Sequence, residues 1–169
     1  AGLAKLMGGR KTFIDKLQMV FDKGLYDPAN EPDIAYPYLF SYFKGEEWRT
    51  QKTVRQLIDK YYTARPDGIP GNEDCGTMSS WVIFSMMGLY PDCPGNPSYT
   101  LTTPVFSKVT LHLDPKYYPD GDITITTDRT SGEQLYIDRM TLGGKPLNAY
   151  RISHADLVKG RNLDMKLKK

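Results

Sequence analysis

The sequence lacks several features that would place it directly in a common class of protein. It has no run of about 18 apolar residues, the length that a membrane-spanning helix needs. It has neither a phosphate-binding P-loop nor a glycine-rich dinucleotide fingerprint. Its 22 basic and 20 acidic side chains are mixed along the chain, so it shows no basic footprint for a nucleic acid. We therefore expect no membrane span and no nucleic-acid partner.

Cysteine and histidine are also scarce, with two of each. Cys75 and Cys93 could form a disulfide in an oxidising compartment, but spacing alone does not give their geometry, and both states stay open. No histidine near Cys75 in the sequence is available to activate its thiol. Ser79 and Ser80 lack the Gly-x-Ser-x-Gly elbow of serine hydrolases. A thiol or serine nucleophile is therefore not favoured.

The first part of the chain has the apolar periodicity of helices. Between the periodic segments lie stretches rich in proline, glycine and polar residues, which predict loops. The last segment is apolar around nearly its whole circumference, which predicts burial on most of its sides. The predicted helices are residues 12–22, 33–43, 46–62 and 77–87.

The pattern changes after residues 91–97, which hold three prolines and a glycine and mark a junction. Beyond it, apolar and polar residues alternate, as in strands with one dry face. We therefore expect an α+β chain, with an antiparallel β-rich part that begins at residue 96. The predicted features are strands at 109–113, 123–126, 140–142 and 163–167, a hairpin turn at 143–144, and a capping box at 153–156 that opens one helical turn.

The loop at residues 71–76 is the first candidate for chemistry. The helical part has no histidine, so carboxylates must do any proton transfer near neutral pH. In an extended loop Asn72 and Asp74 would face one side, where an amide and a carboxylate can hold a water between them. The alternative is that Asp74 or Asn72 only caps the following helix. Both interpretations stay open.

A second candidate is Asn30-Glu31, in a loop flanked by prolines. Amide and carboxylate oxygens suit a hard cation such as calcium. The alternative is an ordinary solvated or capping loop. The aromatic side chains nearby, which include Trp48, could stack on a sugar, although core packing is the better default for them.

These segments resemble glycoside hydrolase family 92. The resemblance is carried by YDPANEPDI and by DGIPGNEDCGTMSSW, and it extends over nearly the whole chain in the family's order. Several long motifs in order are specific, whereas one alone would not be. The matching segments are residues 5–9, 26–34, 36–40, 48–52, 67–81 and 88–95.

The resemblance implies an exo-acting, calcium-dependent α-mannosidase that inverts the anomeric centre. Residues 1–95 would be the last helices of an (α/α)6 barrel, and residues 96–169 a β-rich domain. The partners would be a mannose-containing glycan, with α-1,2 linkages favoured, and the rest of the same polypeptide, namely an N-terminal β-sandwich and the upstream barrel helices. The location would be secreted, periplasmic or at the cell surface, with a role in N-glycan degradation.

The resemblance also implies roles for individual residues. Asp74 matches the carboxylate that activates water, and Asn72 stands where some members have a second, assisting Asp. Asn30 and Glu31 match the sugar and calcium end of the site, while Trp48 and Gln51 match the part that binds substrate. The proton donor would be a glutamate upstream of this chain, so we expect the isolated chain to be inactive.

Two other functions remain possible from the sequence. The chain could be a non-catalytic piece that binds carbohydrate or has a structural role, since it would lack the acid. It could instead belong to another enzyme with a helical barrel, such as a different glycosidase or a lyase. Calcium dependence and the anomer of the product distinguish the second alternative from an inverting mannosidase.

Overall fold

The structure is a computed structural model that describes residues 2–169. It divides between Val82 and Ile83, inside the last helix of the helical part, into two compact units. The domain boundary predicted from composition, at residue 95, lies further along the chain than this division. That boundary stays a prediction. No helix in the described range is long and apolar enough to cross a membrane. Cys75 and Cys93 are both free thiols.

The first unit is helical, and three of the four helices predicted from apolar periodicity are confirmed to within two residues at each end. A short helix before them was not predicted, because five residues are too few to show a period. It is separated from the next by Gly8 and Gly9, whose φ angles of 93° and 106° suit glycine. The helices are α1 (Gly2–Leu6), α2 (Arg10–Asp22), α3 (Glu47–Tyr61) and α4 (Thr77–Met87).

The helix predicted over 33–43 is wrong in type, because two 3-10 helices, η1 (Glu31–Asp33) and η2 (Tyr36–Tyr42), lie there. Their hydrogen bonds span three residues, as from the Tyr38 N–H to the Ala35 carbonyl at 3.0 Å. Tyr38 and Phe40 are both completely buried. In an α-helix, residues two apart would point to nearly opposite sides. The tighter helix lets both side chains enter the core.

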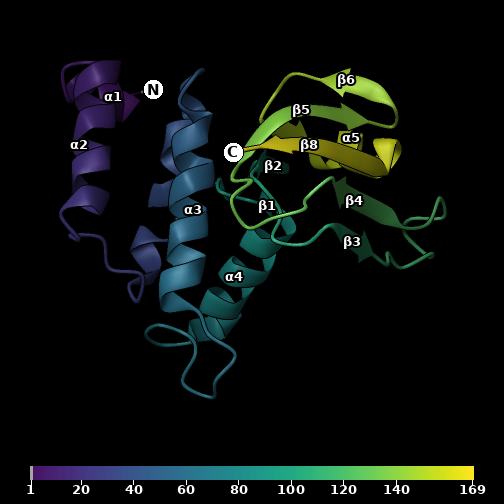
Figure 1. Cartoon of the computed structure of the whole chain (residues 1–169), viewed down its shortest axis with the longest axis horizontal. Helices are drawn as coiled ribbons and strands as arrows, with labels where there is room; N and C mark the ends of the chain where they lie inside the picture. The colour runs from purple at the N-terminus through teal and green to yellow at the C-terminus, as the bar shows by residue number, and fades with distance from the viewer. Residues whose placement is uncertain (1) are drawn as a thin grey trace. The chain divides into compact units, whose positions relative to one another are not determined.

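The core of the first unit joins α1, α2 and η2. Phe13, Ile14 and Leu17 of α2 pack with Phe40 of η2. Helices α2 and α3 stand alongside each other (Figure 1), and Arg49 Nη1 donates to the Gln18 Oε1 between them at 2.7 Å. This packing fixes the loops that follow both helices.

Helix α4 has the predicted bounds, but its predicted burial on most sides is only partly correct. Met78 and Trp81 are almost completely buried, whereas 55% of Ile83 is exposed. One face of an apolar helix is therefore uncovered among residues 2–169.

The second unit contains two sheets, one of three strands and one of five. Neighbouring strands are antiparallel except β4 and β8, which are parallel, so the larger sheet is mixed rather than purely antiparallel. A parallel pair needs a long connection, and the whole segment between these two strands provides it. The sheets have the orders β1 (Leu89–Tyr90), β2 (Ser98–Leu101), β7 (Arg151–Ser153) and β3 (Lys108–Leu111), β4 (Ile123–Thr127), β8 (Asn162–Lys168), β5 (Tyr136–Leu142), β6 (Lys145–Leu147).

The predicted turn and capping box are confirmed in this unit. Gly143 and Gly144, both with positive φ, join β5 to β6 as in a two-residue hairpin. The Ser153 hydroxyl accepts from the Asp156 N–H at 3.0 Å and opens α5 (His154–Gly160), which is longer than the single turn expected. Alternate residues of β8 are buried, as predicted for a strand with one dry face.

Candidate active site

Two loops of the first unit carry the candidate residues, and they meet at Gly71. A Cβ built on Gly71 would lie 2.5 Å from the Ala29 carbonyl oxygen and 2.7 Å from the Ala29 Cα, so only glycine allows this approach. The φ of +67° at Gly71 also favours glycine. Residue 29 precedes the Asn30-Glu31 pair, and residue 71 precedes Asn72. The structure therefore brings the two predicted candidate segments next to each other.

Helix α4 holds the same two loops from a second side. The Trp81 indole N–H donates to the Ile34 carbonyl at 3.0 Å. The indole also stacks on the Tyr62 ring, with centroids 5.4 Å apart and planes 14° apart, and meets the Tyr38 ring edge-on. A buried tryptophan with its N–H satisfied makes a rigid support for both loops.

Asp74 lies at the start of η3 (Asp74–Gly76) and is exposed. Its carbonyl accepts from the Thr77 hydroxyl at 2.6 Å, whereas its carboxylate enters no hydrogen bond or ion pair among residues 2–169. The Asn72 side chain is likewise without a hydrogen bond in that range. The interpretation that Asp74 or Asn72 caps α4 is therefore wrong. The Asp74 carboxylate remains free to act on a ligand.

The expected extended loop is also wrong. The backbone turns at Glu73 (φ −89°, ψ 49°) and again at Cys75, which has a left-handed conformation (φ 53°, ψ 26°). Side chains two residues apart share a side only in extended backbone. Because this backbone is not extended, it does not by itself place Asn72 and Asp74 on one side. A water shared by the two stays a hypothesis.

Glu73, which the sequence did not single out as a functional residue, takes the capping role. Its carboxylate accepts from the Ser79 N–H at 3.1 Å with each oxygen and from the Ser79 hydroxyl at 2.6 Å. The N–H groups of the first helical turn otherwise lack partners. A carboxylate there also interacts favourably with the helix dipole.

The second loop contains a buried polar atom without a partner. Glu31 Oε1 is inaccessible and accepts no hydrogen bond from any described residue. A buried carboxylate oxygen without a partner is costly, and a bound cation would remove that cost. Asn30 beside it is exposed, and its backbone carbonyl accepts from the Asp33 N–H at 2.9 Å. Residues 2–169 contain no group of three or more His, Cys, Asp or Glu side chains that could hold a metal.

The same loop contains Asp33, whose charge and hydrogen bond to the Tyr36 hydroxyl raise the pKa of Tyr36. Glu31 and Asn30 suit a cation as part of a larger coordination shell, because calcium takes six to eight oxygen ligands.

Trp48 and Gln51 are on α3, one turn apart. Trp48 is 41% exposed, and the Arg49 guanidinium lies 4.6 Å from its ring centroid. Gln51 is 3% exposed and is engaged within the protein. A cavity of about 340 Å³ between α2 and α3 is lined by Gln18, Phe21, Asp22, Trp48, Arg49, Lys52, Thr53 and Gln56. Neither Gln51 nor Asp74 lines this cavity.

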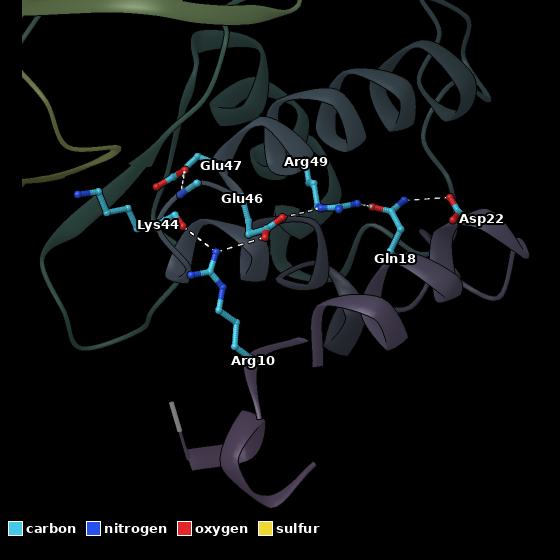
Figure 2. A network of polar contacts seen from close by, with 8 residues as sticks. Arg10, Gln18, Asp22, Lys44, Glu46, Glu47 and Arg49 are labelled. Atoms are coloured by element: carbon cyan, nitrogen blue, oxygen red, sulfur yellow. Dashed lines mark hydrogen bonds and ion pairs between the residues drawn. The ribbon is translucent and has the colours of Figure 1, made fainter. Parts of the chain in front are cut away.

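Arg49, whose guanidinium lies over the Trp48 ring, is also part of a polar network (Figure 2). Arg49 donates to Glu46 at 2.7 Å and to Gln18 at 2.7 Å, while Arg10 reaches the other oxygen of Glu46 at 3.2 Å. The Gln18 amide in turn donates to Asp22 at 2.9 Å. The hydrogen bond from Arg49, aided by Arg10, lowers the pKa of Glu46. The network makes the rim of the cavity rigid and charged.

Comparisons with known proteins agree on one family. Residues 1–169 match the model of the glycosyl hydrolase family 92 catalytic domain. A protein of Arthroderma benhamiae described as an uncharacterized secreted glycosidase is 30% identical over 99% of this chain. Two solved structures from Bacteroides thetaiotaomicron are also similar. A family 92 α-mannosidase bound to mannoimidazole has a TM-score of 0.86 at 28% identity over 95% of this chain. A family 92 inverting mannosidase has a TM-score of 0.84 at 30% identity over 99%.

The chain covers only a part of each of these proteins. It spans 21% of the Arthroderma protein and 22% and 25% of the two Bacteroides chains. The high TM-scores confirm the mixed helix and sheet fold expected from the sequence.

Proposed function

Because this chain belongs to glycosyl hydrolase family 92, we propose that it supplies the water-activating part of an exo-acting, inverting α-mannosidase. The observation that carries the proposal is the free, exposed carboxylate of Asp74, in the loop that meets the Asn30-Glu31 loop at Gly71. The relatives described as an α-mannosidase and as an inverting mannosidase support both the substrate and the stereochemistry.

Asp74 acts as the general base in this proposal. It takes a proton from a water molecule whose oxygen bonds to the anomeric carbon of mannose on the face opposite the leaving group. The glycosidic bond breaks, and the leaving oxygen takes a proton from an acid in the rest of the polypeptide. In inverting enzymes the two carboxyl groups stand about 6.5–9.5 Å apart, which leaves room for the water. β-Mannose is the first product.

Asn72 orients this water rather than deprotonating it. An amide can donate and accept hydrogen bonds but carries no charge. We assign the base to Asp74, because the neighbouring Glu73 accepts hydrogen bonds from Ser79 whereas the Asp74 carboxylate has no such partner among residues 2–169. The proton therefore moves to a single, defined group.

Glu31 and Asn30 contribute oxygen ligands to a calcium ion. The buried Glu31 Oε1 without a partner is the observation that fits this role. When bound, calcium polarises and orients sugar hydroxyls as a Lewis acid. Because calcium takes six to eight oxygen ligands, further ligands would be needed besides these two residues.

The substrate is an α-linked mannose at the end of a glycan, with α-1,2 linkages favoured. Trp48, which lines the cavity between α2 and α3, takes part in binding it, whereas the buried Gln51 does not line that cavity. Residues 1–95 complete an (α/α)6 barrel, and residues 96–169 form the β-rich domain that follows it in the sequence. The description of the Arthroderma relative as secreted supports an extracellular or periplasmic location.

The test is the substitution Asp74→Ala in the full-length enzyme, with an aryl α-mannoside as substrate. Loss of a general base lowers the rate by about 10²–10⁴-fold, so we expect kcat to fall by that factor while KM stays within about threefold. Asn72→Ala serves as the comparison and should lose less. A near wild-type kcat for Asp74→Ala would remove Asp74 from the role.

A further inference from the structure

The hydrogen bonds between Glu73 and Ser79 close the turn that contains Asp74. Glu73 immediately precedes Asp74, and its carboxylate reaches six residues forward to the first turn of α4. A Cβ built on Gly76 would lie 3.8 Å from Glu73 Oε1, so the carboxylate lies across the turn that contains Asp74. The contact thus spans both ends of that turn.

The backbone conformation inside the turn is intrinsically unfavourable. Cys75 is left-handed, which costs a residue with a Cβ about 1–2 kcal/mol. Gly76 follows with a φ of +76°. Conformations of this kind persist when their surroundings determine them. Three contacts do so here, namely the hydrogen bonds from Ser79 to the Glu73 carboxylate, from the Thr77 hydroxyl to the Asp74 carbonyl, and from the Gly76 N–H to the Glu73 carbonyl.

We propose that Glu73 is a positioning residue for the reaction, which fixes Asp74 by binding Ser79. The proposal rests on the proposed role of Asp74 as the base. Both Glu73 oxygens accept hydrogen bonds from Ser79, which gives this carboxylate a structural role beside Asp74. A displacement of about 1 Å in a catalytic group can cost about 10²-fold in rate. Loss of the contact between Glu73 and Ser79 should therefore lower kcat.

Two substitutions separate the reach of Glu73 from its charge. Glu73→Gln keeps the length of the side chain and one acceptor oxygen for the Ser79 N–H but removes the charge. Glu73→Asp keeps the charge but is one methylene shorter and cannot span the turn. A positioning role predicts that Glu73→Gln keeps kcat within about threefold of wild type and that Glu73→Asp loses about 10–100-fold. KM should change by less than about threefold in both.

The measurement is kcat and KM of both variants in the full-length enzyme, with Asp74→Ala as the reference for loss of the base. If Glu73→Asp is more active than Glu73→Gln, the charge acts directly and the positioning role is wrong. If both variants equal wild type while Asp74→Ala is inactive, the positioning role is wrong and the proposed function stands. If Asp74→Ala itself is fully active, the proposed function fails, and the role of Glu73 fails with it.

Discussion

Gly71 is the residue whose lack of a side chain holds the two candidate loops together. Any Cβ there would enter the backbone of Ala29, at 2.5 Å from its carbonyl oxygen. Gly24 is a natural comparison because it has a similar φ of +63° but no atom within 4 Å of a built Cβ. The two glycines separate the cost of a left-handed conformation from the cost of a steric clash.

We expect Gly71→Ala to lower the Tm of the full-length protein much more than Gly24→Ala. The left-handed conformation alone costs about 1 kcal/mol for alanine, whereas Gly71→Ala must also displace neighbouring backbone. Gly71→Ala should also lower kcat, since the loop with Asp74 moves away from the loop with Glu31. Thermal denaturation of both variants measures this, and equal Tm losses would show that the close approach at Gly71 contributes nothing.

Glu31 is the residue on which the proposed calcium site depends. Its buried Oε1 has no partner among the described residues, so Glu31→Ala removes a ligand without breaking any hydrogen bond of that oxygen. We expect calcium affinity of the full-length enzyme to fall by about tenfold or more, since ligand charge sets affinity. Isothermal titration with calcium measures this directly.

Asp15→Asn is a suitable control for that measurement, because Asp15 is exposed on α2 and, among residues 2–169, pairs only with Lys11. It should leave calcium affinity unchanged. Unchanged affinity in Glu31→Ala as well would exclude Glu31 as a ligand.

The sequence identified the candidate segments at the residue scale but not how each residue works within them. Asn72, Asp74 and Glu31 stood out because polar residues sat between glycines or prolines. The capping role of Glu73 could not be predicted, since caps usually act over two or three residues. The contact from Glu73 to Ser79 spans a turn in which Cys75 is left-handed, and nothing in a cysteine indicates that conformation.

At the scale of elements, the pairing of α2 with α3 depends on Glu46. Arg49 and Arg10 both bind its carboxylate, and its pKa is lower than the ordinary 4.5. A carboxyl whose pKa is lower in the folded than in the unfolded state stabilises the fold above the unfolded pKa. That contribution disappears as the pH falls through the folded pKa.

The substitution Glu46→Gln should therefore destabilise the protein near neutral pH by about 1 kcal/mol, the scale of partly exposed ion pairs. The difference from wild type should be complete at pH 7 and shrink as the pH falls below about 4.5, the ordinary glutamate value. Urea denaturation at pH 7 and pH 3 measures it. Glu133→Gln is the control, since that pair with Lys169 is highly exposed, and a constant difference at both pH values would contradict the argument.

Elements with a strong local period were predictable, and those set by distant contacts were not. The apolar stripes of α2 and α3 and the alternation in β8 are properties of the local sequence. The 3-10 form of η2 follows from two core positions that no local period shows. The parallel pairing of β4 with β8 joins strands that are far apart in the chain, and no pattern in either strand encodes it.

At the scale of the whole molecule, the chain is about a fifth of the length of the relatives that it matches. Apolar surface remains on α1, where Leu3 is 59% and Leu6 is 87% exposed. Beside it lies an apolar cavity of about 320 Å³ that includes Met19 and Val20. Further polypeptide covering this surface would account for it, and assays of the proposed activity therefore use the full-length enzyme.

The family was recognisable from the sequence because its motifs are long and ordered, and the match over residues 1–169 confirms it. The contacts that bring those motifs together could not be predicted from the motifs themselves. Gly71 against Ala29 and Trp81 against Ile34 are contacts between segments far apart in the chain. They turn a set of motifs into one candidate site.

The most direct test of the account adds azide to the Asp74→Ala variant of the full-length enzyme. Azide is an anionic nucleophile that needs no base to remove a proton, so it can replace water once the base is lost. We predict that azide restores turnover of an aryl α-mannoside and that the product is β-mannosyl azide. Wild-type turnover without azide, or an α-configured azide product, would contradict a base at Asp74 on the inverting face.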